Sequence, residues 1–149
     1  MSTSREGKSN FRTFLLDTNH CSGILGSNPI MAEKLSELKD SQLYICAIVR
    51  GELMFMAHNS QRKEENLENV RAFLGSIHSF DIDNVTADIY GRIKAGIFAR
   101  YGPRDKKRRR KFKLKQLGVD ENDLWIAAVA RRHGLTVVSA DGGFKRIVE

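Results

Sequence analysis

The sequence predicts an α/β sandwich with a mostly parallel central sheet. Three observations support this prediction. Short apolar runs alternate with segments of helical period along the whole chain, which is typical of parallel strands joined by crossover helices. A length of 149 residues suits a single domain with its own core. The hydrophobic fraction, 41%, is ordinary for a globular protein.

The first 60 residues are predicted to alternate between strands and helices. Residues 11–19 (FRTFLLDTN) form an apolar run that ends in an acid and turn formers, which indicates a buried strand. After an Asn-Pro turn, apolar spacing predicts a helix over 30–40. Residues 43–49 (LYICAIV) are predicted as a second strand, followed by a helix over 50–60. The core face of that helix is expected to contain Leu53, Met56 and Ala57.

The middle of the chain is predicted to be mainly helical. Residues 63–78 have apolar side chains at helical spacing, which indicates an amphipathic helix. A weak third strand is predicted over 79–83. The next helix is predicted over 86–102, with Thr86 as its cap and two internal glycines that weaken it.

The last 30 residues repeat the helix–strand pattern. A largely apolar helix is predicted over 122–134, beginning at Asn122 or the following Asp and ending at Gly134. A strand is predicted over 135–140, and residues 142–149 are expected to form a short closing element. The acids at the start of this helix carry the functional interpretation below.

Positive charge is concentrated in one segment. Residues 100–115 contain ten Lys or Arg and one Asp, a net charge of +9, whereas the rest of the chain contains 15 basic and 17 acidic residues. The formal net charge of +7 therefore belongs to this segment. We expect a single domain over 11–149 with a basic insertion at about 100–116, preceded by a flexible tail at 1–10.

Several protein classes are excluded by absent patterns. No apolar run reaches the ~18 residues that a membrane span needs, and the first ten residues lack the apolar core of a secretory signal. Phosphate-loop, dinucleotide-binding and nucleophile-elbow motifs are missing. Cys21 and Cys46 are expected to be reduced thiols of a cytoplasmic protein, with one disulfide as the alternative.

Four acids are predicted to meet at one edge of the sheet. Asp17 directly follows the first predicted strand, and Asp141 lies just beyond the last. Glu52 is expected in the first turn of the helix after the second strand, and Asp123 in the first turn of the helix over 122–134. Ligands of parallel sheets bind beyond the carboxyl ends of the strands, where these four acids would converge.

Each acid also has a purely structural interpretation. Asp123 could complement a helix dipole with Asn122 as the cap, Asp17 and Asp141 could stabilise turns, and Glu52 could be a solvated helix residue. Together, however, four like charges raise one another's pKa values unless a cation neutralises them. Carboxylates without His or Cys suit Mg²⁺ or Mn²⁺. The sequence therefore predicts a divalent metal site, and a basic segment beside it indicates a phosphate-rich substrate.

These motifs resemble a known family. FLLDTN, GEL, NDLWIAAVARRHGLTVVSAD and the closing Phe, in this order, are similar to PIN-domain ribonucleases, specifically the VapC-type toxins of bacterial toxin–antitoxin pairs. The resemblance spans about residues 13–147, with the basic segment as an apparent insertion. It implies a three-layer α/β/α sandwich and a Mg²⁺- or Mn²⁺-dependent endoribonuclease. It also implies a homodimer held inactive by a small antitoxin that carries a DNA-binding part.

The resemblance also implies the roles of individual residues. Its metal-binding acids match Asp17, Glu52, Asp123 and Asp141, and its polar supporting positions match Thr18, Asn19 and Ser139. Two departures affect this assignment. Asp120 and Glu121 stand beside Asp123, which is preferred because DLWIAA follows directly. Asp141 matches the last acid, a position that varies in such proteins, and Gly142-Gly143 stands where polar residues are often found before the Phe.

The expected reaction is metal-assisted hydrolysis of RNA phosphodiester bonds, with the acids holding one or two ions that activate water. The basic segment is expected to bind RNA phosphates, and Phe112 could stack on a base. Two alternatives are a solvated, mobile loop and a docking site for an acidic part of the antitoxin. The cations in question are Arg104, Lys106, Lys107, Arg108, Arg109, Arg110, Lys111, Lys113 and Lys115.

Two other functions remain open at this point. A non-catalytic RNA- or partner-binding module could keep the same fold, although a pure binder has no use for clustered carboxylates facing phosphates. A nuclease that matures ribosomal RNA would use the same acids as a toxin. The sequence names neither the RNA that is cut nor the antitoxin.

Overall fold

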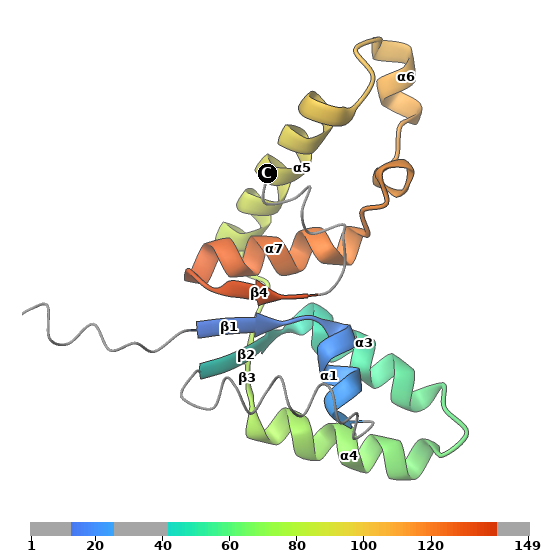
Figure 1. Ribbon diagram of the computed structural model, residues 1–149, viewed down its shortest axis with the longest axis vertical. Helices are drawn as coiled ribbons and strands as arrows, with labels where there is room; N and C mark the ends of the chain where they lie inside the picture. Colours follow the sequence, from blue (N-terminus) through green and yellow to red (C-terminus); the bar gives the residue numbers. More distant parts are fainter. Residues whose placement is uncertain (1–12, 26–41, 140–149) are drawn as a thin grey trace, which may run out of the picture.

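The computed structural model describes residues 13–25 and 42–139 (Figure 1). The helix predicted over 30–40 and the closing element over 142–149 lie outside the described residues. The elements are β1 (Thr13–Leu16), α1 (Thr18–Leu25), β2 (Gln42–Cys46), α3 (Ala47–His58), α4 (Lys63–Ser76), β3 (His78–Phe80), α5 (Asn84–Tyr101), α6 (Lys106–Lys111), the 3₁₀ helix η2 (Leu114–Leu117), α7 (Glu121–His133) and β4 (Thr136–Val138).

The four described strands form one parallel sheet in the order β3-β2-β1-β4. β1 lies at the centre, where Phe14 pairs with Leu43 of β2 and with Thr136 of β4. The predicted α/β sandwich with a parallel sheet is confirmed. Because the strands are parallel, the residues that follow β1, β2 and β4 leave the sheet at the same edge.

The helices pack in two groups on opposite sides of the strands. α1, α3 and α4 contact one another, and α5 packs along α7, with α7 against β4 (Figure 1). The central strands are apolar and buried, as expected for a sheet covered on both faces. The fully buried side chains that join the sheet to both groups include Leu15, Leu16, Ile45, Val49, Leu53, Leu124, Ile126 and Val129.

The boundary between β2 and α3 differs from the prediction. The strand was predicted over 43–49, but β2 ends at Cys46 and α3 begins at Ala47. The apolar run continues from a buried strand into the buried face of a helix, so hydrophobicity alone does not mark the change. As a consequence, Glu52 lies in the second turn of α3, and its predicted place in the first turn is wrong.

Two helix caps also differ from the prediction. α5 is capped by Asp83, whose Oδ1 accepts hydrogen bonds from the backbone N–H (2.7 Å) and the hydroxyl (2.7 Å) of Thr86. Asp120 caps α7 by accepting a hydrogen bond from the backbone N–H of Asn122 (3.0 Å). Thr86 and Asn122 are therefore first-turn residues, and their prediction as caps is wrong. The predicted end of α7 at Gly134 is confirmed, with φ of +66° in the left-handed region.

Other core predictions are mostly confirmed. Leu67, Val70 and Leu74 line the buried face of α4. In α3, Leu53 and Ala57 are buried as predicted, but Met56 is 44% exposed. Val49 takes the third buried position of that helix, one turn before Leu53.

The basic segment is structured. We define the basic arm as residues 100–117, which run from the end of α5 through α6 and η2 and project away from the sheet (Figure 1). The arm folds back on α5, where the rings of Phe98 and Phe112 meet edge to face at 5.4 Å. Within it, the Arg109 Nε atom donates a hydrogen bond to the carbonyl oxygen of Pro103 (2.7 Å). The segment therefore contains helical turns, and its interpretation as an RNA-binding, antitoxin-binding or solvated segment stays a prediction.

Cys21 and Cys46 are not joined by a disulfide, and both are buried. In the described part of the chain, no helix combines the length and apolar character needed to cross a membrane. The division into a tail, one domain and a basic insertion stays a prediction.

Candidate active site

Asp17 leaves the sheet between β1 and α1. It directly follows Leu16, and its backbone N–H donates a hydrogen bond to the carbonyl oxygen of Val138 in β4 (3.4 Å). Although it is an acid, Asp17 is only 4% exposed. Buried carboxylates are uncommon in proteins unless they are hydrogen-bonded or bind a cation, so this position is a candidate functional one.

His20 holds the Asp17 carboxylate in place, which the sequence interpretation missed. Asp17 Oδ1 accepts a hydrogen bond from the His20 backbone N–H (2.9 Å). The same oxygen lies 2.8 Å from His20 Nδ1. Both side chains are buried. The available signal was the spacing of three residues between an acid after a strand and a histidine in the first turn of a helix. One oxygen of Asp17 is thus oriented by α1 itself.

Glu52 of α3 faces this region and carries a raised pKa. Burial is the largest cause, and the negative charges of Asp120 and Asp17 add to it. The side chains of Thr18 and Asn122 act in the opposite direction, since they lower the pKa of Glu52 by stabilising its charged form. Asp17, Glu52 and the start of α7 therefore lie near enough for their charges to interact.

Two acids at the start of α7 complete this group. Asp123 lies in the first turn of α7, and its Oδ2 atom is shielded from solvent. Asp120, the helix cap, is exposed and contributes its charge to Glu52. We call Asp17, Glu52, Asp120 and Asp123 the acidic edge. The sequence named three of its members as ligands and set Asp120 aside.

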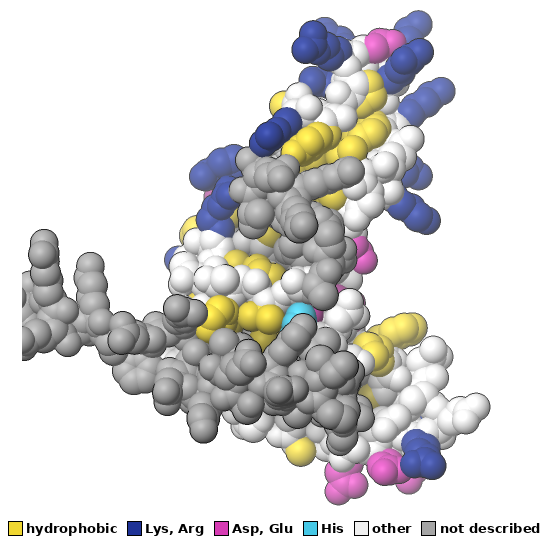
Figure 2. Space-filling view, in the orientation of Figure 1, with side chains coloured by type: hydrophobic (Ala, Val, Ile, Leu, Met, Phe, Trp, Pro, Cys, Tyr) yellow, Lys and Arg dark blue, Asp and Glu magenta, His cyan; other side chains and the backbone are white. Residues whose placement is uncertain are grey.

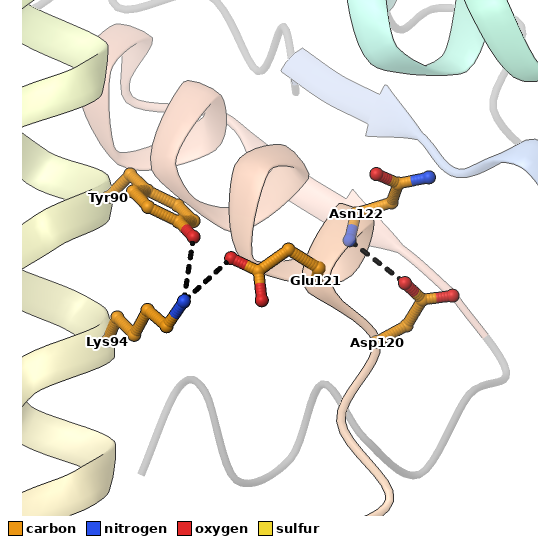
Figure 3. A network of polar contacts seen from close by, with 5 residues as sticks. All are labelled: Tyr90, Lys94, Asp120, Glu121 and Asn122. Atoms are coloured by element: carbon orange, nitrogen blue, oxygen red, sulfur yellow. Dashed lines mark hydrogen bonds and ion pairs between the residues drawn. The ribbon is translucent and has the colours of Figure 1, made fainter. Parts of the chain in front are cut away.

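Glu121 is turned away from the acidic edge. Its Oε1 atom accepts a hydrogen bond from Lys94 Nζ on α5 (3.0 Å), and the same ammonium group donates to the Tyr90 hydroxyl (3.2 Å) (Figure 3). The Tyr90 ring in turn stacks on Trp125 of α7 at 3.8 Å. Glu121 therefore links α7 to α5 through Lys94, and the choice of Asp123 as the third acid stays a prediction.

The predicted supporting residues lie around the acidic edge. Thr18 begins α1, and its Oγ1 atom is buried with no hydrogen-bond partner among the described residues, although it is near enough to Glu52 to affect the pKa of that carboxyl. Asn19 is exposed on α1, and Ser139 is half-buried just after β4. Asp141, the fourth predicted ligand, lies outside the described residues.

The acidic edge offers the atom types that bind a hard divalent cation. They are carboxylate oxygens and the buried Thr18 hydroxyl, which are the oxygen ligands that Mg²⁺ and Mn²⁺ prefer. Within residues 13–25 and 42–139, however, no three acidic, His or Cys side chains are arranged closely enough to hold an ion. Assignment of individual ligands therefore stays a prediction.

The nine predicted RNA-binding cations all lie exposed on the basic arm. α6 consists of Lys and Arg alone and has no buried residue. Figure 2 shows these side chains as a dense group at the end of the molecule formed by the arm. The arm continues through η2 into Asp120, so positive charge leads directly to the acidic edge.

Comparison with known proteins gives a family and a set of relatives. The sequence pattern of the PIN domain matches residues 14–149. The chain is similar to "tRNA(fMet)-specific endonuclease VapC" of Shigella flexneri, with 28% identity over 126 residues, which covers 85% of this chain and 84% of that protein. It is also similar to "Ribonuclease VapC2" of Rickettsia felis, with 28% identity over 137 residues, covering 90% and 91%.

Solved structures show the same fold. The chain superposes on DNA-bound VapBC of Salmonella typhimurium with a TM-score of 0.73 and 27% identity, covering 92% of this chain and 93% of that one. VapBC2 of Rickettsia felis, bound to a DNA fragment from its promoter, gives a TM-score of 0.69 and 26% identity, covering 90% and 92%.

Proposed function

The chain belongs to the PIN-domain family, and from this membership we propose that it is a metal-dependent endoribonuclease, the toxin of a toxin–antitoxin pair. The observation that carries the proposal is the acidic edge, where the charges of Asp17 and Asp120 act on Glu52 and the chain leading into Asp120 carries a net charge of +9 over residues 100–115. The names of the relatives, an endonuclease and a ribonuclease of VapC type, support the same reaction class.

The proposed ligands of the metal are Asp17, Glu52, Asp123 and Asp141. A bound Mg²⁺ or Mn²⁺ would supply the positive charge that activates water for attack on phosphorus and offsets charge on the phosphate. The chain would supply orientation. His20 fixes one oxygen of Asp17, and the hydroxyl of Thr18 together with Asn19 and Ser139 would position ligands or water.

The basic arm is proposed to bind the RNA backbone. Its nine exposed cations would neutralise phosphates and release counterions, so that affinity falls steeply as salt rises. Binding of this kind carries no sequence information by itself. The proposed arm therefore brings many RNAs to the acidic edge, while selection among them depends on other contacts.

Two partners are proposed from the relatives. VapBC complexes of 26% and 27% identity support a cognate antitoxin as the inhibitor of this chain. A homodimer is proposed from the family resemblance. The tRNA named for the Shigella relative makes tRNA the first RNA class to test.

The test is cleavage of total tRNA by the purified chain in Mg²⁺ or Mn²⁺. Discrete fragments that disappear in EDTA and in Asp17→Asn would support the proposal. Asp88→Asn is the matched control, because Asp88 is an exposed acid on α5 outside the acidic edge. Absence of cleavage of tRNA and total RNA, together with no stabilisation of the fold by Mn²⁺, would favour a non-catalytic binding module instead.

A further inference from the structure

A groove lies between α5, the basic arm and the start of α7. Its volume is about 750 Å³, within the ~300–1,000 Å³ range of small-molecule sites. Its lining includes Phe98 on α5, Phe112 and Leu114 on the arm, and Asp120 at the start of α7. One member of the acidic edge therefore borders the groove.

The floor of the groove is apolar and aromatic. Phe98 and Phe112 are half-buried, with their rings in edge-to-face contact at 5.4 Å. Leu114 and Val119 are buried beside them. Hydrophobic side chains are visible between α5 and the arm, with Lys and Arg side chains around them (Figure 2). A half-buried aromatic floor inside the most charged part of the molecule is not needed for phosphate neutralisation alone.

The walls of the groove are fixed. Gly118 ends η2 with φ of +71°, a conformation that favours glycine, and turns the chain so that Val119 is buried and Asp120 caps α7. On the opposite wall, Lys94 is held by Glu121 and Tyr90 (Figure 3). Lys113 and Lys115 are exposed at the rim, where their ammonium groups can reach an anion.

We propose that this groove binds an unpaired nucleobase of the RNA substrate, next to the phosphate that is cut. Resting on the proposed ribonuclease function, the inference names the structural class of RNA that the site accepts. The base would lie on Phe112, beside the ring of Phe98, and Lys113 and Lys115 would contact the phosphates on either side of it. Bases inside an A-form helix cannot reach such a floor, whereas bases of loops and single strands can.

Charge complementarity selects this occupant over an apolar peptide segment. A nucleotide has both a π-face for the aromatic floor and a negative phosphate for the lysine rim, and base–aromatic stacking is the common mode of single-strand recognition. Asp120 lines the groove and caps α7, three residues before Asp123, so the groove adjoins the start of α7. A nucleotide in the groove would thus place the next phosphate of the strand at the acidic edge.

The experiment uses the full chain carrying Asp17→Asn, so that RNA is bound without being cut. The probe is a single-stranded RNA oligonucleotide with 2-aminopurine at one position, whose emission is quenched when the base stacks. It is compared with the same strand carrying an abasic site and with a duplex of the same sequence. We expect quenching and binding that is on the order of tenfold tighter for the intact strand than for the abasic one.

The decisive variant is Phe112→Leu, which keeps apolar volume but removes the π-face. It should abolish quenching and bind intact and abasic strands equally. Phe73→Leu is the matched control, since Phe73 is a half-buried phenylalanine of α4 packed against the core. Folding of both variants is compared by their melting temperatures.

Three results would overturn the proposal in different ways. In the first, Phe112→Leu and its Asp17→Asn parent prefer the intact strand over the abasic one to the same degree, while the unmodified chain still cuts RNA. This result would rule out the base site but not the ribonuclease function. In the second, a partner protein shields the groove residues from solvent and RNA does not. This result would make the groove a protein-binding site. No binding or cleavage of any RNA would remove the proposed function and the base site together.

Discussion

The acidic edge contains a buried carboxylate, that of Asp17, whereas the cations of the basic arm are exposed to solvent. Asp17 is 4% exposed and has two hydrogen-bond contacts to His20, but α6 has no buried residue at all. This difference in burial fits the proposed roles of the two regions, catalysis at the acidic edge and RNA attraction by the basic arm. Chemistry at one phosphorus atom needs ligands at fixed positions, while attraction of a polyanion needs only enough positive charge nearby.

This contrast predicts that substitutions in the two regions change different quantities. A change at the acidic edge should lower the rate of the chemical step even when all RNA is bound. A change on the basic arm should lower affinity and its salt dependence and leave the rate at saturation alone. The following predictions test this division from the largest expected effect to the smallest.

Asp17→Asn should lower the cleavage rate by on the order of 1,000-fold, because several kcal/mol of metal-derived charge stabilisation would be lost. The fold should survive, since the Asn carbonyl oxygen can still accept the hydrogen bond from the His20 backbone N–H. Single-turnover cleavage and a thermal melt measure the two effects. A folded variant that cuts at the parental rate would remove Asp17 from the mechanism.

Leu124→Ala should lower the free energy of unfolding by about 2–5 kcal/mol, as expected when a fully buried leucine is truncated. Lys111→Ala on the arm should change it by no more than about 0.5 kcal/mol, since exposed substitutions rarely cost more. Urea unfolding followed by circular dichroism compares them. Similar losses for both would contradict the description of the arm as a peripheral element.

Replacing Lys106, Arg108 and Arg110 by Gln should make the slope of log affinity against log salt less negative by about 2, the value for three lost contacts to a single strand. The same three charges removed from α4 and its start, at Arg62, Lys63 and Arg71, provide the matched control. RNA binding by the Asp17→Asn background from 50 to 200 mM salt is the measurement. Equal slopes in both triple variants would show that the arm has no special role.

Glu52→Gln should stabilise the apo protein slightly near pH 7. The pKa of Glu52 is raised in the folded state, so the folded state binds more protons than the unfolded one, and stability from this group falls as pH rises through its titration. The gain in melting temperature should therefore disappear below about pH 4, where both states are protonated. A gain that is the same at pH 4 and pH 7 would mean that packing, not charge, causes it.

Strands and most helices were predictable because their signals are local. The apolar run before Asp17 and the periodic positions of α4 predict their elements without tertiary information. The β2–α3 boundary was not predictable, because Ala47, Ile48 and Val49 are apolar and partly or fully buried, a pattern that suits a strand as well as a helix. Asp83 and Asp120 were missed as caps because Thr86 and Asn122, also good cap residues, lie within three positions of them.

The acids of the candidate site could be named from the sequence, and their assignment as ligands stays a prediction. The rule that parallel strands deliver side chains to one edge predicts that Asp17, Glu52 and Asp123 lie near one another. Whether Asp120 or Glu121 belongs with them depends on contacts far apart in sequence. Lys94 reaches Glu121 across 27 positions, and only the packing of α5 on α7 reveals that this acid is already engaged. Such pairings have no local signature.

The most direct test of the division between the two regions is single-turnover cleavage at saturating protein, with Mn²⁺ present. Three proteins are compared: the parent, Asp17→Asn and the triple Gln variant of the arm. The account predicts that the arm variant reaches the parental rate once the RNA is saturated, while Asp17→Asn stays slower by orders of magnitude at every concentration. Parental cleavage by Asp17→Asn at saturation would contradict it.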